Sequence, residues 1–296
     1  MSGPDGLSIA HGVMRFADLF GVVLVDPNEP PTARVASLFA ALDRGSWEKI
    51  GMIDDLVVAI NVSRHGPEQF VVLCETGKMF FAGSGDQHIE RLPEITPQMW
   101  RGLDRIGDRL FATGLGYRVC RRDGQNQWTA LSGGLPAASH ELAGFETVCG
   151  FSDRELYAAG WHGEVWRFDG TVWHDEGSPT NQVIGSSLAA SDGLAYLCGR
   201  QGTLLAGRQG RWRILNDPED GVVEDFWSLA EFDGSIYVAS EQAIYRIVQD
   251  ELETVRIDAH GYSGTHYQLS VADGHLCSIG ANDILIFDGR SWTRMT

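Results

Sequence analysis

Seven related segments recur along the chain at intervals of about 41 residues, and this repetition restricts the fold more than any other feature. Each segment has an apolar run, a short turn, a second apolar run, a tight turn and then a marker position that is usually Trp. Markers at this spacing span nearly all of the 296 residues, so the repeat describes the whole chain. The marker positions are Trp47, Ile89, Trp128, Trp173, Trp212, Thr254 and Trp292.

The apolar runs within each repeat have the character of β-strands. They are short, rich in Val, Ile, Tyr, Phe and Trp, and interrupted by Gly or Asp about every 5 to 10 residues. Helical repeats of similar length would show apolar residues every three to four positions. A period of about 40 to 45 residues with four strands per repeat is typical of a propeller. We therefore predict an all-β fold, a seven-bladed β-propeller of four-stranded antiparallel blades.

The repeat from Phe145 to Glu176 shows how four strands fit into one blade. Asp169 and Gly170 form a tight turn between two apolar runs, and Gly supplies the positive φ that such hairpin turns require. Similar Asp-Gly pairs recur at corresponding turns of other repeats. We expect strands A, B, C and D of this blade near residues 146–150, 155–159, 164–168 and 171–175.

Residues 1–296 are predicted to form a single propeller domain with blades ending near residues 50, 92, 131, 176, 215, 257 and 296. The last repeat carries its own strand D, and the first must then supply four strands between Ile9 and Ile50. This arrangement predicts closure of the ring by side-chain packing between the first and seventh blades. In an alternative register, residues 7–11 complete the seventh blade.

The repeat resembles that of bacterial seven-bladed propellers with the motif G-x-x-G-x-[VI]-x-x-x-D-G-x-x-W, relatives of the YVTN, sialidase-type and WD-like propellers. The resemblance covers most of the chain and implies the propeller fold, but one fold hosts many functions. The Asp-box of sialidases, S-x-D-x-G-x-T-W, is not met, because its Asp and Gly are adjacent here. The motif is matched best by Gly160, Gly163, Val165, Asp169, Gly170 and Trp173.

Charge narrows the range of partners. The formal net charge is −17 and the isoelectric point is near 4.8. A protein that binds a phosphate backbone needs a basic surface, so we expect no nucleic acid partner, and an anionic membrane surface is disfavoured for the same reason. We also expect no membrane-spanning segment, since no apolar run reaches the roughly 18 residues that a spanning helix needs.

The cysteines and the N-terminal sequence favour a cytoplasmic protein. Residues 1–15 lack a basic start followed by an apolar stretch, the pattern of a signal peptide. The five cysteines form no C-x-x-C pair, and each lies in an apolar, strand-like segment. Buried, reduced thiols in a reducing compartment are the simplest interpretation.

Antiparallel connectivity sorts the connections of a propeller onto two faces. The A–B and C–D turns lie on one face, and they are short except for Ser63–Gln69. The B–C turns and the D–A crossovers lie on the other face, and the crossovers include several long segments. Long loops on a rigid scaffold usually carry the binding residues, so we expect binding at this second face.

The candidate binding residues are loop residues that do not repeat from blade to blade. Three tryptophans among them are either surface anchors or residues that pack beneath a loop. The stretch Asp217–Asp225 is either a solvated loop or a docking surface for a basic partner. The repeating tryptophans are expected to pack between blades. The candidates are Trp100, Trp161, His162, Arg200, Glu224, Asp225, Trp227, His260, Tyr262 and His266.

The leading hypothesis is a non-catalytic propeller that binds another protein through its loop-rich face. The acidity favours a basic partner, as for a cytoplasmic inhibitor or immunity protein. A second hypothesis is a hydrolase or lyase with its site at the central channel, and a third is a carbohydrate-binding or assembly module. The second would use His162, Glu241, His260 and His266, with Arg200 holding an anion.

No motif in the sequence predicts a cofactor or a catalytic residue. His260 and His266 would need a third ligand to hold a metal ion, and their six-residue spacing on a loop is a weak signal. The chain has no G-x-S-x-G motif, P-loop or dinucleotide-binding fingerprint. We therefore predict no metal, no cofactor and no catalytic site.

Overall fold

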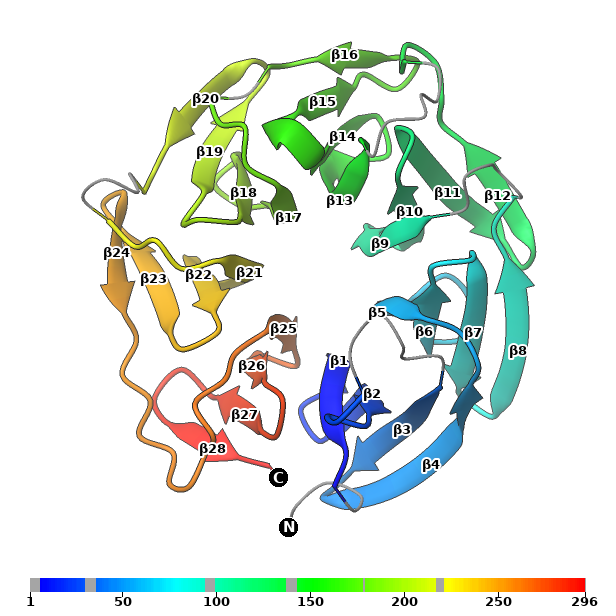
Figure 1. Ribbon diagram of the computed structural model, residues 1–296, viewed down its shortest axis with the longest axis vertical. Coiled ribbons are helices and arrows are strands. Elements are labelled where there is room, and N and C mark those ends of the chain that lie inside the picture. Colours follow the sequence, from blue (N-terminus) through cyan, green and yellow to red (C-terminus); the bar gives the residue numbers. More distant parts are fainter. Residues whose placement is uncertain are drawn as a thin grey trace.

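Seven sheets surround a central axis in the computed structural model, which describes residues 6–29, 36–93, 99–136, 143–177, 179–216 and 221–295. In this part of the chain every sheet has four strands, and the helix content is limited to the 3-10 turn η2 (Trp161–Gly163). Figure 1 shows the sheets as the blades of a ring, with the two termini side by side. The predicted seven-bladed propeller with four-stranded antiparallel blades is confirmed.

Blades 1 to 4 contain β1 (Ser8–Phe16), β2 (Leu19–Val25), β3 (Ser37–Asp43), β4 (Ser46–Ile53), β5 (Val57–Ser63), β6 (Gln69–Cys74), β7 (Lys78–Gly83), β8 (Asp86–Arg91), β9 (Trp100–Ile106), β10 (Arg109–Gly114), β11 (Arg118–Gly124), β12 (Gln127–Ala130), β13 (Phe145–Ser152), β14 (Glu155–Gly160), β15 (Val165–Phe168) and β16 (Trp173–Asp175). Blades 5 to 7 contain β17 (Ile184–Ala189), β18 (Ala195–Gly199), β19 (Leu204–Arg208), β20 (Arg211–Ile214), β21 (Phe226–Phe232), β22 (Ser235–Ser240), β23 (Ile244–Val248), β24 (Glu251–Thr254), β25 (Gln268–Ala272), β26 (His275–Ile279), β27 (Ile284–Phe287) and β28 (Trp292–Arg294).

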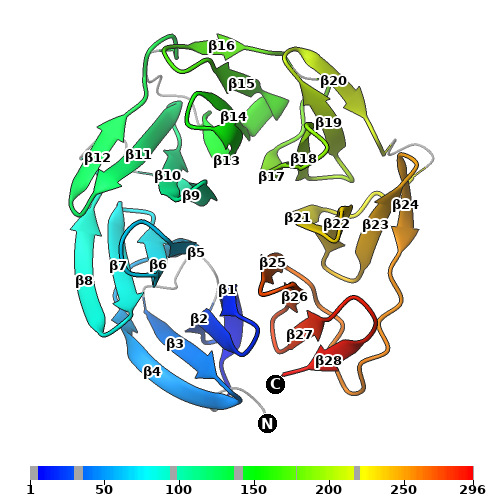
Figure 2. The same ribbon diagram turned by 180° about the vertical axis from the view of Figure 1, so that it is seen from behind.

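Each blade uses four consecutive strands, with strand A nearest the axis and strand D at the rim (Figures 1 and 2). In blade 4, the residues of the C–D turn stabilise the hairpin. The Asp169 carboxylate accepts hydrogen bonds from the backbone N–H groups of Thr171 and Val172, at 2.8 and 2.9 Å. Gly170 has a φ of +96°, and Phe168 pairs with Trp173 across the hairpin. The turn sequence therefore fixes the register of the two outer strands.

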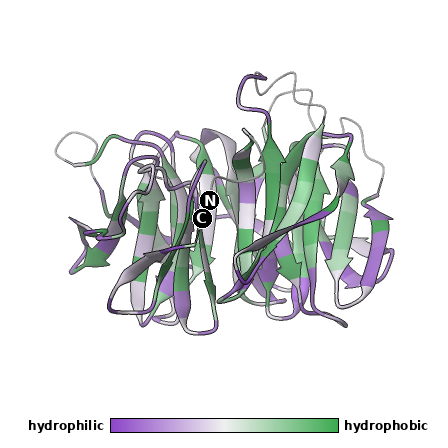
Figure 3. Cartoon of the chain, turned by 90° about the horizontal axis from the view of Figure 1, so that it is seen from below, coloured by the Kyte–Doolittle hydropathy of each residue, from purple (hydrophilic) through white to green (hydrophobic). Residues whose placement is uncertain are grey.

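The hydrophobic core is divided among the contacts between blades. The buried apolar residues described here form seven clusters, one at each interface between neighbouring blades. Figure 3 shows hydrophobic residues mainly in the strands and many hydrophilic residues near the strand ends. The repeating tryptophans lie in or against these clusters, which confirms their predicted role. They are Trp47, Trp128, Trp173, Trp212 and Trp292.

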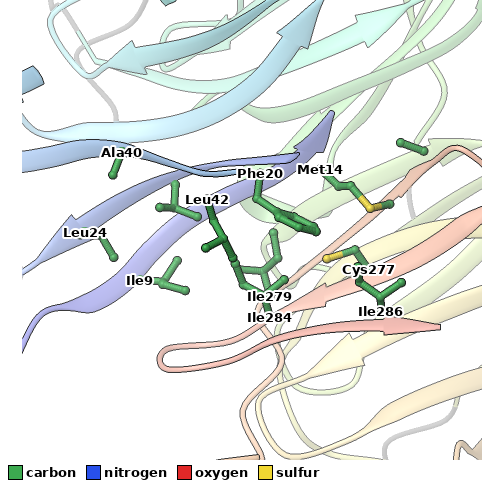
Figure 4. Packing of buried hydrophobic residues seen from close by; sticks show 12 residues of the cluster. Ile9, Met14, Phe20, Leu24, Ala40, Leu42, Cys277, Ile279, Ile284 and Ile286 are labelled. Atoms are coloured by element: carbon green, nitrogen blue, oxygen red, sulfur yellow. The ribbon is translucent and has the colours of Figure 1, made fainter. Parts of the chain in front are cut away.

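Side-chain packing closes the ring. Blade 1 is built from β1 to β4 and blade 7 from β25 to β28, so neither borrows a strand from the other. Figure 4 shows Phe20 and Leu42 of blade 1 packed against Ile279 and Ile284 of blade 7. The predicted closure by packing is confirmed, and the alternative in which residues 7–11 complete the seventh blade is wrong, because they belong to or precede β1, which pairs with β2.

Polar contacts fix the register of this closure. The Ile9 N–H donates to the Ala281 carbonyl at 2.7 Å, and the Met14 N–H donates to Ser270 Oγ at 3.2 Å. Further along β1, the Gly12 N–H donates to the Gln268 side chain. These bonds prevent the two blades from sliding past each other, a constraint that apolar packing alone does not supply.

Candidate functional site

B–C turns and D–A loops lie together on one face of the ring, which we call the loop-rich face. Backbone hydrogen bonds join the two kinds of connection: the Gly202 N–H donates to the Glu224 carbonyl at 2.8 Å, and the His266 N–H donates to the Glu241 carbonyl at 2.9 Å. The opposite face, formed by the A–B and C–D turns, is called the turn face. The described parts of the loops between blades 5 and 6 and between blades 6 and 7 therefore lie against B–C turns on one surface.

Trp227 is the exposed aromatic residue of the loop-rich face. It is 45% exposed, whereas the other eight tryptophans of the chain are buried or half-buried. Phe226 anchors the start of β21 in the core between blades 5 and 6, and strand alternation then directs Trp227 away from that core. The ring of Trp227 meets Tyr267 edge-on, with centroids 6.1 Å apart and planes at 84°. Nearby in the chain, Val223 is 63% exposed.

One carboxylate contacts this aromatic pair, and two more lie just before Trp227 in the chain. The Tyr267 hydroxyl donates to Glu241 Oε1 at 3.0 Å, and both burial and this carboxylate raise the pKa of Tyr267. Asp225 Oδ1 accepts the backbone N–H of Gln201 at 2.8 Å. Glu224 Oε2 is buried and has no hydrogen-bond donor among the described residues, and burial together with the Glu224 charge raises the pKa of Tyr245.

None of these three acids forms an ion pair within the part of the chain that the structure describes. We call the surface formed by Val223, Glu224, Asp225, Trp227, Glu241 and Tyr267 the Trp227 patch. It combines exposed apolar area with negative charge that no neighbouring basic side chain neutralises.

Trp161 has a different environment. Its indole Nε1 donates to Glu146 Oε1 at 2.6 Å, and Arg101 Nε donates to both oxygens of Glu146 at 3.1 Å. Arg101 also lies 3.7 Å from Glu75. We call Glu75, Arg101, Glu146 and Trp161 the Trp161 cluster. The polar groups of these four side chains form hydrogen bonds or ion pairs with one another, so Trp161 is part of an internal polar network.

Three further candidates are exposed and separate. His162 lies in η2 with a φ of +59°, next to the buried Gly163. Arg200 lies at the B–C turn of blade 5, where its backbone N–H donates to the Val183 carbonyl at 3.0 Å. His260 is exposed on the loop between blades 6 and 7. No hydrogen bond or ion pair connects these three side chains within the described ranges.

His266 is a buried residue of the core. It is 1% exposed, and its Nδ1 shares a hydrogen bond of 2.8 Å with Ser278 Oγ. Burial lowers the pKa of His266 to about 4, although the Asp283 carboxylate opposes the shift. Tyr262 is half-buried above it, with ring centroids 5.8 Å apart. The ring of His266 is therefore neutral at pH 7 and unavailable to a partner.

The prediction of Trp100 as a binding residue is wrong. Trp100 is 1% exposed and packs with Leu73, Leu103 and Leu110 in the cluster between blades 2 and 3. A side chain on Gly77 would approach its indole nitrogen to 2.8 Å, so the fit is tight. The physical reason is its place at the first residue of β9, where the pleat directs it into the interface between blades.

No hydrogen bond or ion pair joins the side chains suggested for catalysis among the described residues, although the Glu241 carbonyl accepts the backbone N–H of His266. His266 is buried, whereas His162, Arg200 and His260 are exposed at three different connections. The described residues also contain no group of three or more His, Cys, Asp or Glu side chains arranged to hold a metal ion. The first part of the acidic stretch, residues 217–220, lies outside the described residues.

Sequence reasoning missed several members of the two sites. Val223 is an apolar residue within an acidic loop, and its exposure could have been suspected from that contrast. Tyr267 follows the loop that carries His260 and Tyr262, but its contact with Trp227 joins two blades. Glu146 is the second residue of β13, and no pattern in the sequence distinguishes it.

A curated relative identifies the family. The sequence is 39% identical over 295 residues to "Immune protein Tsi7" of Pseudomonas aeruginosa, and the match covers 96% of this chain and 95% of the relative. The chain belongs to the family of Tsi7. This membership agrees with the inhibitor or immunity protein that the sequence favoured over an enzyme or a carbohydrate-binding module. No protein-family model matches the sequence, so the specific repeat motif stays a prediction.

Solved structures show the same architecture in distant proteins. The WD40 β-propeller domain of Doa1 has a TM-score of 0.72 at 10% identity, with 98% of this chain and 96% of that chain covered. A catalytically inactive virginiamycin B lyase from Staphylococcus aureus, with quinupristin, has a TM-score of 0.71 at 11% identity and coverage of 97% and 94%. YCF48 bound to D1 peptide has a TM-score of 0.68 at 16% identity and coverage of 97% and 93%. At these identities the likeness shows the fold alone.

In this chain, no helix within the described residues is long and apolar enough to span a bilayer.

Proposed function

We propose that this member of the Tsi7 family is an immunity protein that neutralises a toxic protein by covering it with the Trp227 patch. The relative carries the description "Immune protein", and the match extends over 96% of this chain. Such a role needs stable association with a protein and no catalytic group on the propeller. It therefore agrees with a site built from aromatic and acidic side chains.

The observation that carries the proposal is the exposure of Trp227 beside acids that lack a basic neighbour. Trp and Tyr dominate the binding energy of many protein interfaces, because each buries a large, rigid surface on association. Trp227 and Tyr267 already pack edge-on, so little side-chain freedom remains to be lost on binding. The patch is therefore prepared to bury its apolar area against a partner.

The charge of the patch supports a basic partner. Glu224, Asp225 and Glu241 have no ion pair among the described residues, and the whole chain carries a formal charge of −17. Lys or Arg side chains of a partner would supply the missing counter-charges, and the long-range field would speed the encounter. A basic toxic protein is accordingly the partner that we propose.

We also propose that the chain acts in the cytoplasm and that its repeat belongs to the bacterial propellers described above. All five cysteines are free and buried, which supports a reducing compartment. The hairpin at Asp169 and Gly170 has the geometry that the repeat motif implies. Fractionation of the native cells and comparison with further relatives would test these two points.

The experiment that tests the function has two parts. First, the tagged protein is recovered from the bacterium that carries its gene, and the bound protein is identified and purified. Second, growth is measured when that protein is produced alone, with the wild-type chain, or with the Trp227→Ala variant. We expect the partner to stop growth, the wild-type chain to restore it, and the variant to fail.

A matched control is Ile89→Ala, because Ile89 is 50% exposed on β8, away from the patch. This variant should protect as well as the wild-type chain. The proposal is wrong if the partner does not impair growth, or if Trp227→Ala and Ile89→Ala protect equally well.

A further inference from the structure

Three arginines from neighbouring blades gather at the turn face, where their inner strands end. Arg15 belongs to β1 and Arg105 to β9, and Arg64 lies in the loop between β5 and β6. That loop is contained in Ser63–Gln69, the one long connection of the turn face. We call Arg15, Arg64 and Arg105 the arginine cluster. A concentration of positive charge is unexpected in a chain whose net charge is −17.

One carboxylate is shared by two of the arginines. Arg64 Nε donates to Glu68 Oε1 at 2.9 Å, and Arg15 Nε lies 3.8 Å from Glu68 Oε2. Arg15 is held in place by a hydrogen bond of 3.0 Å from Nη2 to Ser84 Oγ, and its guanidinium lies 5.8 Å from the ring centre of Phe70. The first two guanidinium groups therefore face one acid from two blades.

Arg105 adds a third guanidinium without an acid of its own. Its Nη1 donates to the Gly107 carbonyl at 3.0 Å, and no carboxylate within the described residues pairs with it. Burial lowers the pKa of Arg105, and the positive charge of Arg64 lowers it further, whereas Asp108 and Glu68 oppose the shift. Arg105 is therefore a partly desolvated cation that lies near another cation.

Two N–H groups of the cluster have no acceptor. Arg15 Nε and Arg105 Nε are both buried, and neither makes a hydrogen bond within the ranges that the structure describes. A buried donor on a charged group costs free energy when it has no acceptor. An incoming oxyanion would balance the excess positive charge of the three guanidinium groups.

We propose that Arg15, Arg64 and Arg105 form a binding site for an oxyanion, either a carboxylate or a phosphate group, on the turn face. The fixed, planar fork of donors on guanidinium matches both groups, and both form charge-assisted hydrogen bonds with it. The site lies on the face opposite the Trp227 patch, so it does not depend on the proposed function. Glu68 acts as an internal competitor for the same donors.

This competition gives a direct test. Isothermal titration calorimetry with inorganic phosphate and with citrate, each at constant ionic strength and pH, would measure affinity for wild type, Glu68→Gln, Arg105→Gln and Arg211→Gln. Arg211 is an exposed arginine on β20 outside the cluster and serves as the matched control. Thermal unfolding in the same solutions gives a second readout.

We expect saturable binding to the wild-type chain and to Arg211→Gln, with at least threefold tighter binding to Glu68→Gln. Arg105→Gln should lose at least tenfold in affinity. Stronger binding of phosphate than of citrate would assign the site to a phosphate group, and the reverse order to a carboxylate. The wild-type Tm should rise by roughly 1–2 °C at several times the dissociation constant.

Two results would overturn the proposal. One is the absence of binding to both wild type and Glu68→Gln. The other is an equal response of all four proteins, which would show a general effect of the salt. If circular dichroism shows that Arg105→Gln is unfolded, Arg64→Gln takes its place, since the Arg64 side chain is 43% exposed and tolerates replacement more readily.

Discussion

Trp161 and Trp227 lie on the same face of the propeller, yet their surroundings differ. The indole of Trp161 donates to Glu146, whose charge is balanced by Arg101, so the polar groups of this region are satisfied within the chain. Trp227 contacts Tyr267, whose hydroxyl donates to Glu241, and no basic side chain completes that series in the described residues. One arrangement stabilises the fold, and the other remains open to a partner.

The comparison shows that residue type alone does not distinguish the exposed tryptophan that we propose for binding from a structural one. Both tryptophans are absent from the framework of the repeat, and both have carboxylates nearby. Arg101 makes the difference, because a basic neighbour turns a carboxylate and an indole into a closed network. Four predictions test this distinction, from the largest expected effect to the smallest.

Trp227→Ala should weaken partner binding by about 30-fold to 1,000-fold, the range for an aromatic residue at the centre of an interface. It should change the unfolding free energy by less than about 1 kcal/mol, because the side chain is 45% exposed in the free protein. Calorimetric titration with the purified partner measures the first effect, and urea denaturation measures the second. Normal partner binding by this variant would show that Trp227 is no more a binding residue than Trp161.

Arg101→Met should lower the unfolding free energy by about 1–3 kcal/mol, because it leaves the half-buried Glu146 carboxylate without its cation. Partner binding should be unchanged once the variant is folded. The matched control is Arg246→Met, which breaks an exposed ion pair with Glu253 and should cost less than about 1 kcal/mol. Equal effects in the two variants would show that the Trp161 cluster is not a stabilising network.

Asp104 makes the stability of the protein depend on pH. It lies on β9, the strand that carries Arg101, and accepts from Val148 of β13, the strand that carries Glu146. Burial raises the pKa of Asp104 to about 7, while hydrogen bonds from the Val148 N–H and the Thr147 side chain oppose the shift. The folded state therefore holds this proton more tightly than the unfolded chain, where the pKa is near its ordinary value of about 3.9. The contribution of Asp104 to stability is full below about pH 4, falls as the pH rises to about 7, and is constant above that.

Asp104→Asn should accordingly raise the unfolding free energy by about 1–2 kcal/mol at pH 8 and by little at pH 4, since Asn keeps an acceptor for the Val148 N–H. Urea denaturation at the two pH values checks this. A gain of the same size at both values would contradict an ionisation effect.

Glu241→Gln should weaken partner binding by about threefold to tenfold and reduce the dependence of the association rate on salt, because one uncompensated charge is removed. Gln retains an oxygen that can accept from the Tyr267 hydroxyl. The control is Glu251→Gln on β24, an exposed acid outside the patch. Stopped-flow association at low and high salt would distinguish the two. An unchanged salt dependence would argue against a basic partner.

The repeat pattern alone predicts much of the architecture. Alternating apolar runs, Asp-Gly turns and recurring tryptophans specify four strands per blade and seven blades, because each blade can bury its faces only against similar neighbours. The strands predicted for blade 4 agree with β13 to β16 within a few residues. Closure by packing was also predictable, since the first and last repeats each hold four strands.

The exposure of individual loop side chains could not be predicted from the sequence. Trp100, Trp161 and Trp227 are equivalent as non-repeating loop tryptophans, but they are buried, half-buried and exposed in the structure. Likewise, His260 and His266 share one loop, but His260 is exposed whereas His266 is buried and hydrogen-bonded to Ser278. These outcomes depend on contacts between residues that lie far apart in the chain.

What the sequence by itself determined is therefore the periodic part of the protein: the strands, the turns, the inter-blade tryptophans and the overall acidity. Only the tertiary structure decided which charges are neutralised. Arg101 of the preceding blade pairs with the Glu146 carboxylate, whereas the Glu241 carboxylate accepts from Tyr267 and has no basic partner among the described residues. The physical reason is that strands and turns at repeated positions depend on residues that are close together in the chain. Whether a charge is compensated depends instead on which side chains of neighbouring blades come within hydrogen-bonding distance.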